Sequence, residues 1–125
     1  MFRLNTAAGE PMFEQIEQMI AKYVCMGALE AHEQLPSVRA MAAELGINPN
    51  TVAKSYKSLE AHGIIYTIPG KGAFVAANDS AEAFFARKSL AAFRQAVSEA
   101  KLAHIEEAAL VQELRQIYKG EQKND

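Results

Sequence analysis

The stretch LGINPNTVAKSYKSLEAHGII, residues 45–65, carries a proline inside a pattern that otherwise predicts a helix. A proline in a helix interior removes a backbone hydrogen bond and costs about 3 kcal/mol. Asn48, however, is a preferred N-cap residue, and proline is favoured at the first helical position after a cap. This helix is therefore predicted to begin at Pro49 and to end near His62, where Gly63 stops it.

The residues before Asn48 predict a second, shorter helix. Ser37 is an N-cap type residue, and apolar residues follow it at helical spacing as far as Leu45. Gly46 closes this helix, so a glycine-containing turn of about four residues separates it from the helix at Pro49. Two helices joined in this way predict a helix-turn-helix.

The segments on either side complete the fold. Residues 11–26 carry apolar side chains at helical spacing and predict an amphipathic first helix, followed by a loop over residues 30–36. Residues 64–68 and 73–75 are apolar and rich in strand-forming types, and the glycine-rich run Pro69–Gly72 separates them, which predicts a two-stranded hairpin. A helix-turn-helix followed by a hairpin is a winged helix.

The chain changes character after Asn78 and becomes alanine-rich and helical. Residues 78–125 cannot bury a core alone, so they must pack on the winged helix, on a second copy, or on both. The absence of proline and glycine over residues 101–107 leaves open whether this tail is one helix or two. An apolar stripe on it is the predicted dimer seam. It consists of Leu90, Phe93, Val97, Leu114 and Ile117.

The predicted fold is thus mainly α with a small β-hairpin: a winged helix-turn-helix domain followed by a short helical dimerisation tail. The domain spans residues 1–77, with its core at 9–77, and the tail spans 78–125. The chain has 125 residues and one cysteine, which suits one compact domain with an appendage and rules out an internal disulfide framework. It has no apolar run of about 18 residues and no signal-peptide pattern, so we expect a cytoplasmic protein without a membrane span.

Charge is distributed unevenly along the chain. The net charge of −2 argues against nucleic-acid binding, but residues 34–77 carry four basic and two acidic side chains, a local charge of +2. The basic side chains are those of Arg39, Lys54, Lys57 and Lys71, and the acidic ones are those of Glu44 and Glu60. A basic surface here must be small and must come from where the charges are placed.

The predicted helix at Pro49 carries two different stripes. Val52, Tyr56 and Leu59 form the buried one, whereas Asn50, Lys54 and Lys57 form an exposed one of amide and ammonium groups. Asparagine can pair with adenine in the major groove, and lysine can reach a phosphate or a guanine. A solvated helix face is the alternative interpretation, which the flanking turn and wing make less favourable. The candidate DNA-binding residues are Ser37, Arg39, Asn48, Asn50, Thr51, Lys54, Lys57, Gly70, Lys71 and Gly72.

The residues do not indicate an enzyme. His32, His62 and His104 have no metal-ligand spacing with one another or with Cys25, and no phosphate-binding glycine loop is present. We therefore predict a protein without catalytic residues, metal or cofactor. The sequence leaves open whether a small-molecule effector binds.

The run LPSVRAMAAELGINPNTVAKSYKSLEAHGIIYTIPGKGAFV, residues 35–75, resembles the winged-helix domain of GntR-type bacterial transcriptional regulators. The matching pieces are the P-S-x-R start, the L-G-I turn, the T-V-x-x-x-Y-x-x-L-E helix and the G-x-G-x-F-V wing. Within that family, I-N-P-N-T-V and the short helical tail resemble the YtrA-like branch.

The resemblance implies a homodimer that binds an inverted-repeat operator, one half-site per subunit, and acts as a repressor. It places DNA contacts on Ser37, Arg39, Asn50, Thr51 and the wing. Many relatives carry arginine where this chain has Pro49, which implies that base readout shifts to Asn50, Lys54 or Arg39. Relatives usually have a glycine in the tail turn, where this chain has Ala103-His104. The alternative function is a winged-helix protein-interaction module, which the net acidic charge would allow.

Overall fold

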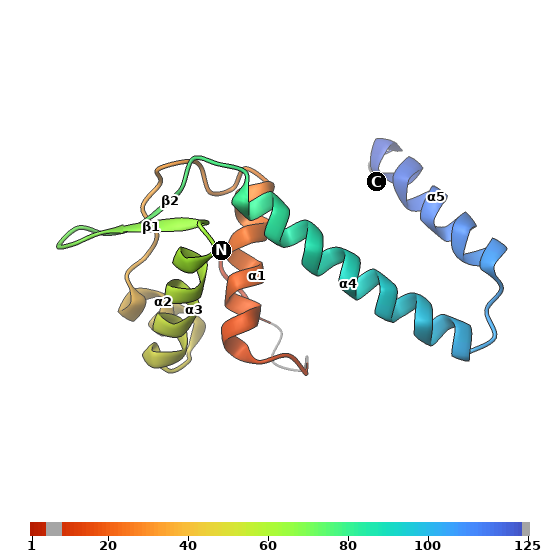
Figure 1. The fold of residues 1–125 in the computed structure, drawn as a ribbon, viewed down its shortest axis with the longest axis horizontal. Helices are drawn as coiled ribbons and strands as arrows, with labels where there is room; N and C mark the ends of the chain where they lie inside the picture. Colours follow the sequence, from red (N-terminus) through yellow and green to blue (C-terminus); the bar gives the residue numbers. More distant parts are fainter. Residues whose placement is uncertain (5–8, 124–125) are drawn as a thin grey trace. The chain divides into compact units, whose positions relative to one another are not determined.

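A computed structural model describes residues 1–4 and 9–123 of the chain. The helices and strands follow in the order α1 (Met12–Cys25), α2 (Val38–Leu45), α3 (Pro49–Ala61), β1 (Ile65–Ile68), β2 (Gly72–Val75), α4 (Ser80–Leu102) and α5 (Glu107–Lys123) (Figure 1). They form two compact units, Met1–Lys88 and Ser89–Asp125. The domain boundary predicted after Ala77 lies just before α4, whereas the first unit continues through the first turns of that helix. The mainly α winged helix predicted from the sequence is confirmed.

Local sequence signals set the ends of α2 and α3. The Ser37 hydroxyl oxygen accepts a hydrogen bond from the Ala40 backbone N–H at 3.0 Å, and Gly46 ends α2 with φ +71°. The Asn48 side-chain oxygen accepts from the Asn50 backbone N–H at 2.7 Å, and Pro49 is the first residue of α3. The predicted caps are confirmed, and they explain why a proline stands at this place.

The core of the first unit lies between α1, α2 and α3. Both α1 and α2 pack against α3, and β1 packs against the end of α3 (Figure 1). The predicted inner stripe of α3, Val52, Tyr56 and Leu59, is buried. From α1 and α2, the fully buried side chains include Ile16, Ile20 and Met41. Helix α3 and the elements packed against it therefore form one body, in which α3 has little freedom to shift.

The first turn of α4 also belongs to this core. Ala81 and Phe84 are buried, and the edge of the His62 ring meets the Phe84 ring at 5.1 Å between centroids. His62 is the C-cap residue of α3, and the following Gly63 has φ +78°. The tail thus begins as part of the winged-helix core.

The wing is a hairpin with one addition. Strands β1 and β2 pair antiparallel, with Tyr66 opposite Phe74 and Ile68 opposite Gly72. Residues 30–36, predicted as a loop, contribute a further pairing: Gln34 forms an antiparallel bridge with Phe74, and the Leu35 N–H donates to the Ala73 carbonyl at 2.8 Å. Extended backbone before Pro36 favours this pairing, because the residue before a proline avoids helical angles.

The tail consists of two helices, which settles the alternative left open by the sequence. After α4 the Ile105 N–H donates to the Ala100 carbonyl at 3.1 Å, and His104 adopts a left-handed conformation with φ +62°. This is the usual way in which a helix ends, although the residue in that conformation is most often glycine. Within residues 1–4 and 9–123, no helix is both long and apolar enough to cross a lipid bilayer.

We expect His104→Gly to raise the free energy of unfolding by about 0.5–1 kcal/mol, because the left-handed conformation is costly for a residue with a Cβ atom. The measurement is urea denaturation at a fixed protein concentration. His104→Ala is the matched control. It keeps a Cβ atom and should not show the gain. A His104→Gly protein less stable than the His104→Ala protein would contradict the prediction.

Candidate nucleic-acid interface

The start of α2 offers a phosphate-type site. Ser37 uses its hydroxyl oxygen as the cap, and its hydroxyl proton is available to an outside acceptor. Arg39 is exposed two residues later, and it makes no hydrogen bond or ion pair with any residue that the structure describes. An ion pair with Glu44 would have been the ordinary surface role for Arg39. A hydroxyl and a free guanidinium beside the backbone N–H groups of a helix start are suited to an anionic oxygen.

The start of α3 presents short polar side chains. Asn48 accepts a hydrogen bond through its oxygen, so its outward function is limited to its NH₂ group. The side chain of Asn50 is exposed and has no partner among the described residues, and Thr51 is half-buried. Asn50 therefore has both its donor and its acceptor available, which is what bidentate recognition of an adenine edge requires.

The two lysines of α3 have different surroundings. The Lys54 ammonium lies 4.0 Å from the centroid of the Phe13 ring, which belongs to α1. This cation–π contact holds the Lys54 ammonium beside α1. Lys57 is exposed and contacts no acidic group in the described part of the chain. The stripe predicted from helical spacing is thus divided into a tethered lysine and a free one.

Tyr56 joins α3 to the start of α2. Its hydroxyl donates to the Pro36 carbonyl at 2.7 Å, directly before the Ser37 cap. Burial raises the pKa of the Tyr56 phenol, and the nearby Glu44 carboxylate raises it further. The phenol therefore stays protonated at neutral pH and remains a donor. The candidate phosphate site at α2 is consequently fixed in relation to α3.

The wing tip carries the third group of predicted residues. The Lys71 N–H donates to the Ile68 carbonyl at 2.9 Å, which closes a turn with Pro69 and Gly70 at its centre. Gly70 has φ +78°, as the third residue of a type II turn requires. Lys71 is exposed at this tip, and its ammonium contacts no acidic side chain in the residues described.

The two acidic residues of this region are both engaged. Glu44 accepts a hydrogen bond from the Phe2 backbone N–H at 3.4 Å, and Glu60 accepts one from the Thr67 hydroxyl at 3.3 Å. In contrast, the side chains of Arg39, Lys57 and Lys71 have no anionic partner among the described residues. The side chains of Arg39, Lys57 and Lys71 thus form no ion pair within the described residues, although the chain as a whole has a net charge of −2.

Sequence reasoning missed two contacts of this surface. Nothing in the periodicity linked Phe13 to Lys54, because a cation–π contact between helices depends on how the helices cross. The Tyr56 bond to Pro36 had a partial signal. A tyrosine on a buried stripe needs a partner for its hydroxyl, but the sequence does not say which carbonyl supplies it.

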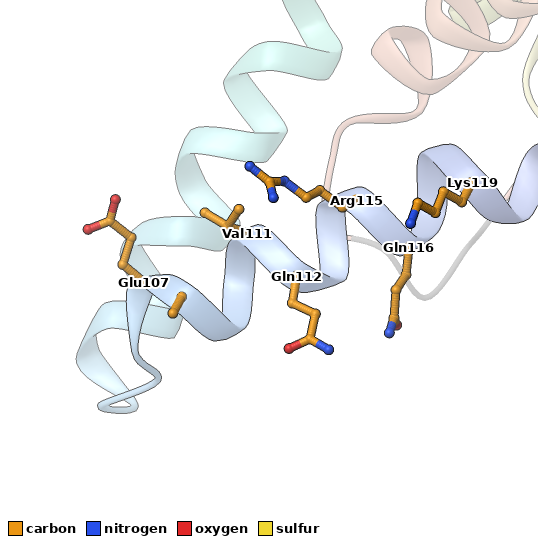
Figure 2. Close-up of a pocket in the computed structure, with 7 residues that line it drawn as sticks. Glu107, Val111, Gln112, Arg115, Gln116 and Lys119 are labelled. Carbon is orange, nitrogen blue, oxygen red and sulfur yellow. The ribbon is translucent and has the colours of Figure 1, made fainter.

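The second unit carries the predicted seam and a groove. Leu90 and Phe93 are each 50% exposed, Leu114 is 41% and Ile117 is 62% exposed, and Val97 is half-buried. A groove of about 650 Å³ runs along α5, lined by Glu107, Ala108, Val111, Gln112, Arg115, Gln116 and Lys119 (Figure 2). It contains none of the predicted DNA-binding residues, and its lining comes from one helix. The apolar stripe, rather than this groove, is the feature of the tail that exposes large apolar side chains to water.

Comparison with known proteins gives a matching family, related sequences and similar solved structures. The family described as bacterial regulatory proteins, gntR family, matches residues 12–75. The HTH-type transcriptional repressor YtrA of Bacillus subtilis (strain 168) is 32% identical over 130 residues, with 100% of both chains covered. A transcriptional regulator from Oenococcus oeni is 35% identical, with a TM-score of 0.69 over 92% of this chain and 97% of that one.

A GntR family transcriptional regulator from Listeria monocytogenes has a TM-score of 0.74 at 27% identity, covering 86% of this chain and 96% of that chain. Family, whole-length relative and solved structures thus agree with the winged helix and the short tail. The chain belongs to the GntR family of bacterial DNA-binding transcriptional regulators, a class without enzymatic activity.

Proposed function

We propose that this protein is a sequence-specific repressor that binds an inverted-repeat operator as a homodimer. The observation that carries the proposal is the set of unpartnered donors at the starts of α2 and α3 and at the wing tip. The likeness to the repressor YtrA over the full length of the chain supports the direction of regulation.

In this proposal some residues contact base edges and others contact phosphates. Asn50 enters the major groove and contacts an adenine edge, because its amide is exposed and free at the front of α3. Ser37, Arg39 and Lys57 contact phosphates and fix the register of α3 on the duplex. Pro49 cannot donate a hydrogen bond from a side chain, so base readout rests on Asn50 and its neighbours.

Dimerisation follows from the exposed apolar stripe. Large apolar side chains such as Phe93 and Ile117 are half or more exposed in the single chain, and a second copy would remove them from water. A two-fold dimer presents two identical winged-helix domains in opposite directions, so its operator is an inverted repeat. This seam occupies residues that take no part in the candidate DNA-binding surface.

The direct test is binding to DNA from the promoter region of the protein's own gene. Fluorescence anisotropy should show specific binding that weakens steeply as the salt concentration rises. Sedimentation should show two protein chains per operator. If no fragment binds and the protein instead forms a stable complex with another protein, the alternative of an interaction module would replace the proposal.

Arg39→Ala should lower operator affinity by about 1–3 kcal/mol and reduce the steepness of the salt dependence, because one phosphate contact is lost. Arg39 has no partner among the described residues, so its removal should leave the free energy of unfolding nearly unchanged. Fluorescence anisotropy at fixed salt, repeated at several salt concentrations, measures both effects.

Arg115→Ala is the matched control, since it removes the same charge from an exposed position on α5 (Figure 2). Its operator affinity should stay within about twofold of the parent protein, because charges outside the interface are largely screened by salt. Equal losses for the two variants would mean that Arg39 acts only through net charge, and would remove it from the site.

A further inference from the structure

Gln34 makes a contact with the wing that the hairpin alone does not explain. Its side-chain Nε2 donates to the Lys71 carbonyl at 2.7 Å, across 37 positions of sequence. Its backbone forms an antiparallel bridge with Phe74, so the side chain is carried along the edge of β2 toward the tip. The Gln34 amide therefore belongs to a segment that is paired with β2, and it reaches the turn at Lys71 from outside the β1–β2 hairpin.

This contact holds the backbone of Lys71 at both ends. The Lys71 N–H already donates to the Ile68 carbonyl at 2.9 Å, and Gln34 binds the Lys71 carbonyl. Only the lysine side chain is left free to act outward. Short hairpin tips are mobile, because few tertiary contacts oppose the entropy of their residues. A second anchor on Lys71 reduces that freedom before any ligand binds.

Gly72 shows how closely the amide approaches the tip. A Cβ atom added at Gly72 would lie 2.8 Å from the Gln34 Nε2 atom, and φ at Gly72 is +126°. The backbone angle disfavours any residue with a side chain here, and a Cβ atom would displace the end of the Gln34 side chain from its position beside the tip. The glycine of the G-K-G tip thus serves the approach of Gln34 as well as the turn.

Gln34 also stands three positions before Ser37, the cap residue of α2. The same short segment therefore pairs with β2, holds the wing tip and leads into the candidate phosphate site at Ser37 and Arg39. Leu35, between them, is buried in the core and fixes the segment. The wing tip and the start of α2 are consequently coupled through a few residues of backbone.

We propose that Gln34 is a positioning residue for DNA binding, which holds the wing tip so that the Lys71 ammonium meets the sugar-phosphate backbone in a preset position. This inference rests on the proposed function, since it concerns the same DNA-binding surface. Gln34 itself does not contact DNA in this account. It lowers the entropy that the tip would otherwise lose on binding.

The test is a double-mutant cycle with Gln34→Met and Lys71→Ala, read by anisotropy on the operator fragment at fixed salt. Methionine matches the length of glutamine, is uncharged and has no donor. Gln34→Met should weaken binding about three- to tenfold, the range of one net hydrogen bond. In the Lys71→Ala background the same change should have less than about a twofold effect, because the group being positioned is gone.

Gln18→Met is the matched control. It also removes an exposed amide donor, the one from Gln18 Nε2 to the Glu10 carboxylate, but on α1. Its operator affinity should equal that of the parent protein. A reduction as large as that of Gln34→Met would overturn the proposal, because the loss would then come from the substitution type rather than from the wing.

A second measurement has its main readout in the parent protein, so that readout does not depend on a variant folding. Backbone ¹⁵N relaxation of the parent protein should give order parameters of about 0.85 at Gly70, Lys71 and Gly72, as for rigid backbone. Values below about 0.6 would show a mobile tip and overturn the proposal. In Gln34→Met the same three amides should become more mobile, while those of α3 stay unchanged.

The outcomes separate this inference from the proposed function. If the parent protein binds no operator, the proposed function fails. If it binds but Gln34→Met binds equally well, or Lys71→Ala has no effect, only the positioning role fails. Independent effects of the two changes, which multiply in the double variant, would also overturn the role of Gln34.

Discussion

Phe93→Glu is expected to convert the protein to monomers and to lower operator affinity by about 100-fold or more. Phe93 is 50% exposed on α4, and Leu90, one turn before it, is exposed to the same extent. In the proposed dimer a carboxylate at this position would lose its water without gaining a partner, which costs several kcal/mol. The two winged-helix domains would then no longer be linked to each other. Such a link contributes a factor of about 10²–10⁴ in apparent affinity.

Sedimentation at micromolar concentration measures the assembly, and anisotropy on the operator measures the second effect. Ala91→Glu is the matched control, because it adds the same charge to an exposed position of α4 outside the apolar stripe. It should remain dimeric. A Phe93→Glu protein that still sediments as a dimer would move the seam to another surface, and the winged-helix assignment would be unaffected.

Leu59→Ala is expected to lower the free energy of unfolding by about 2–5 kcal/mol, the range for removing a buried leucine side chain and leaving a cavity. Leu59 is fully buried on the inner face of α3, within the core that α1 shares with α3. The total free energy of unfolding of a small domain is about 5–15 kcal/mol, so this one change would remove a large part of the stability. Operator binding should be lost at a lower temperature than in the parent protein.

Urea denaturation at one protein concentration measures the loss, because the apparent stability of the proposed dimer would depend on concentration. Leu102→Ala makes the same chemical change at a side chain that is 79% exposed. It should alter the free energy of unfolding by less than about 0.5 kcal/mol, as is usual for surface positions. Equal losses for the two variants would contradict the burial of Leu59.

The order and type of the elements could be predicted from the sequence because each has a local cause. Ser37 and Asn48 are N-cap residues whose side chains accept hydrogen bonds within their own helices. Gly46 and Gly63 have the left-handed angles predicted for helix ends. These signals act over a few residues, so neighbouring chemistry is enough to locate them. The inner stripe of α3 is also local, because helical spacing alone places its residues on one side.

The tail turn shows the limit of local signals. Residues 101–107 contain neither glycine nor proline, yet the chain breaks there and His104 takes the left-handed conformation. Any residue other than glycine adopts this conformation at a cost, so its type gives little indication. The resemblance indicated a turn at Ala103-His104, but only the backbone showed that the chain breaks there and that the tail divides into α4 and α5.

The sequence by itself determined the winged helix, the three segments that bear the candidate DNA contacts, and the family. Tertiary structure alone decided how those side chains are held. It tied Lys54 to Phe13, Tyr56 to Pro36, and Gln34 to the Lys71 carbonyl. The physical reason is that each of these contacts joins residues far apart in the chain, whose meeting depends on how helices cross and strands pair. Spacing along one element cannot contain that information.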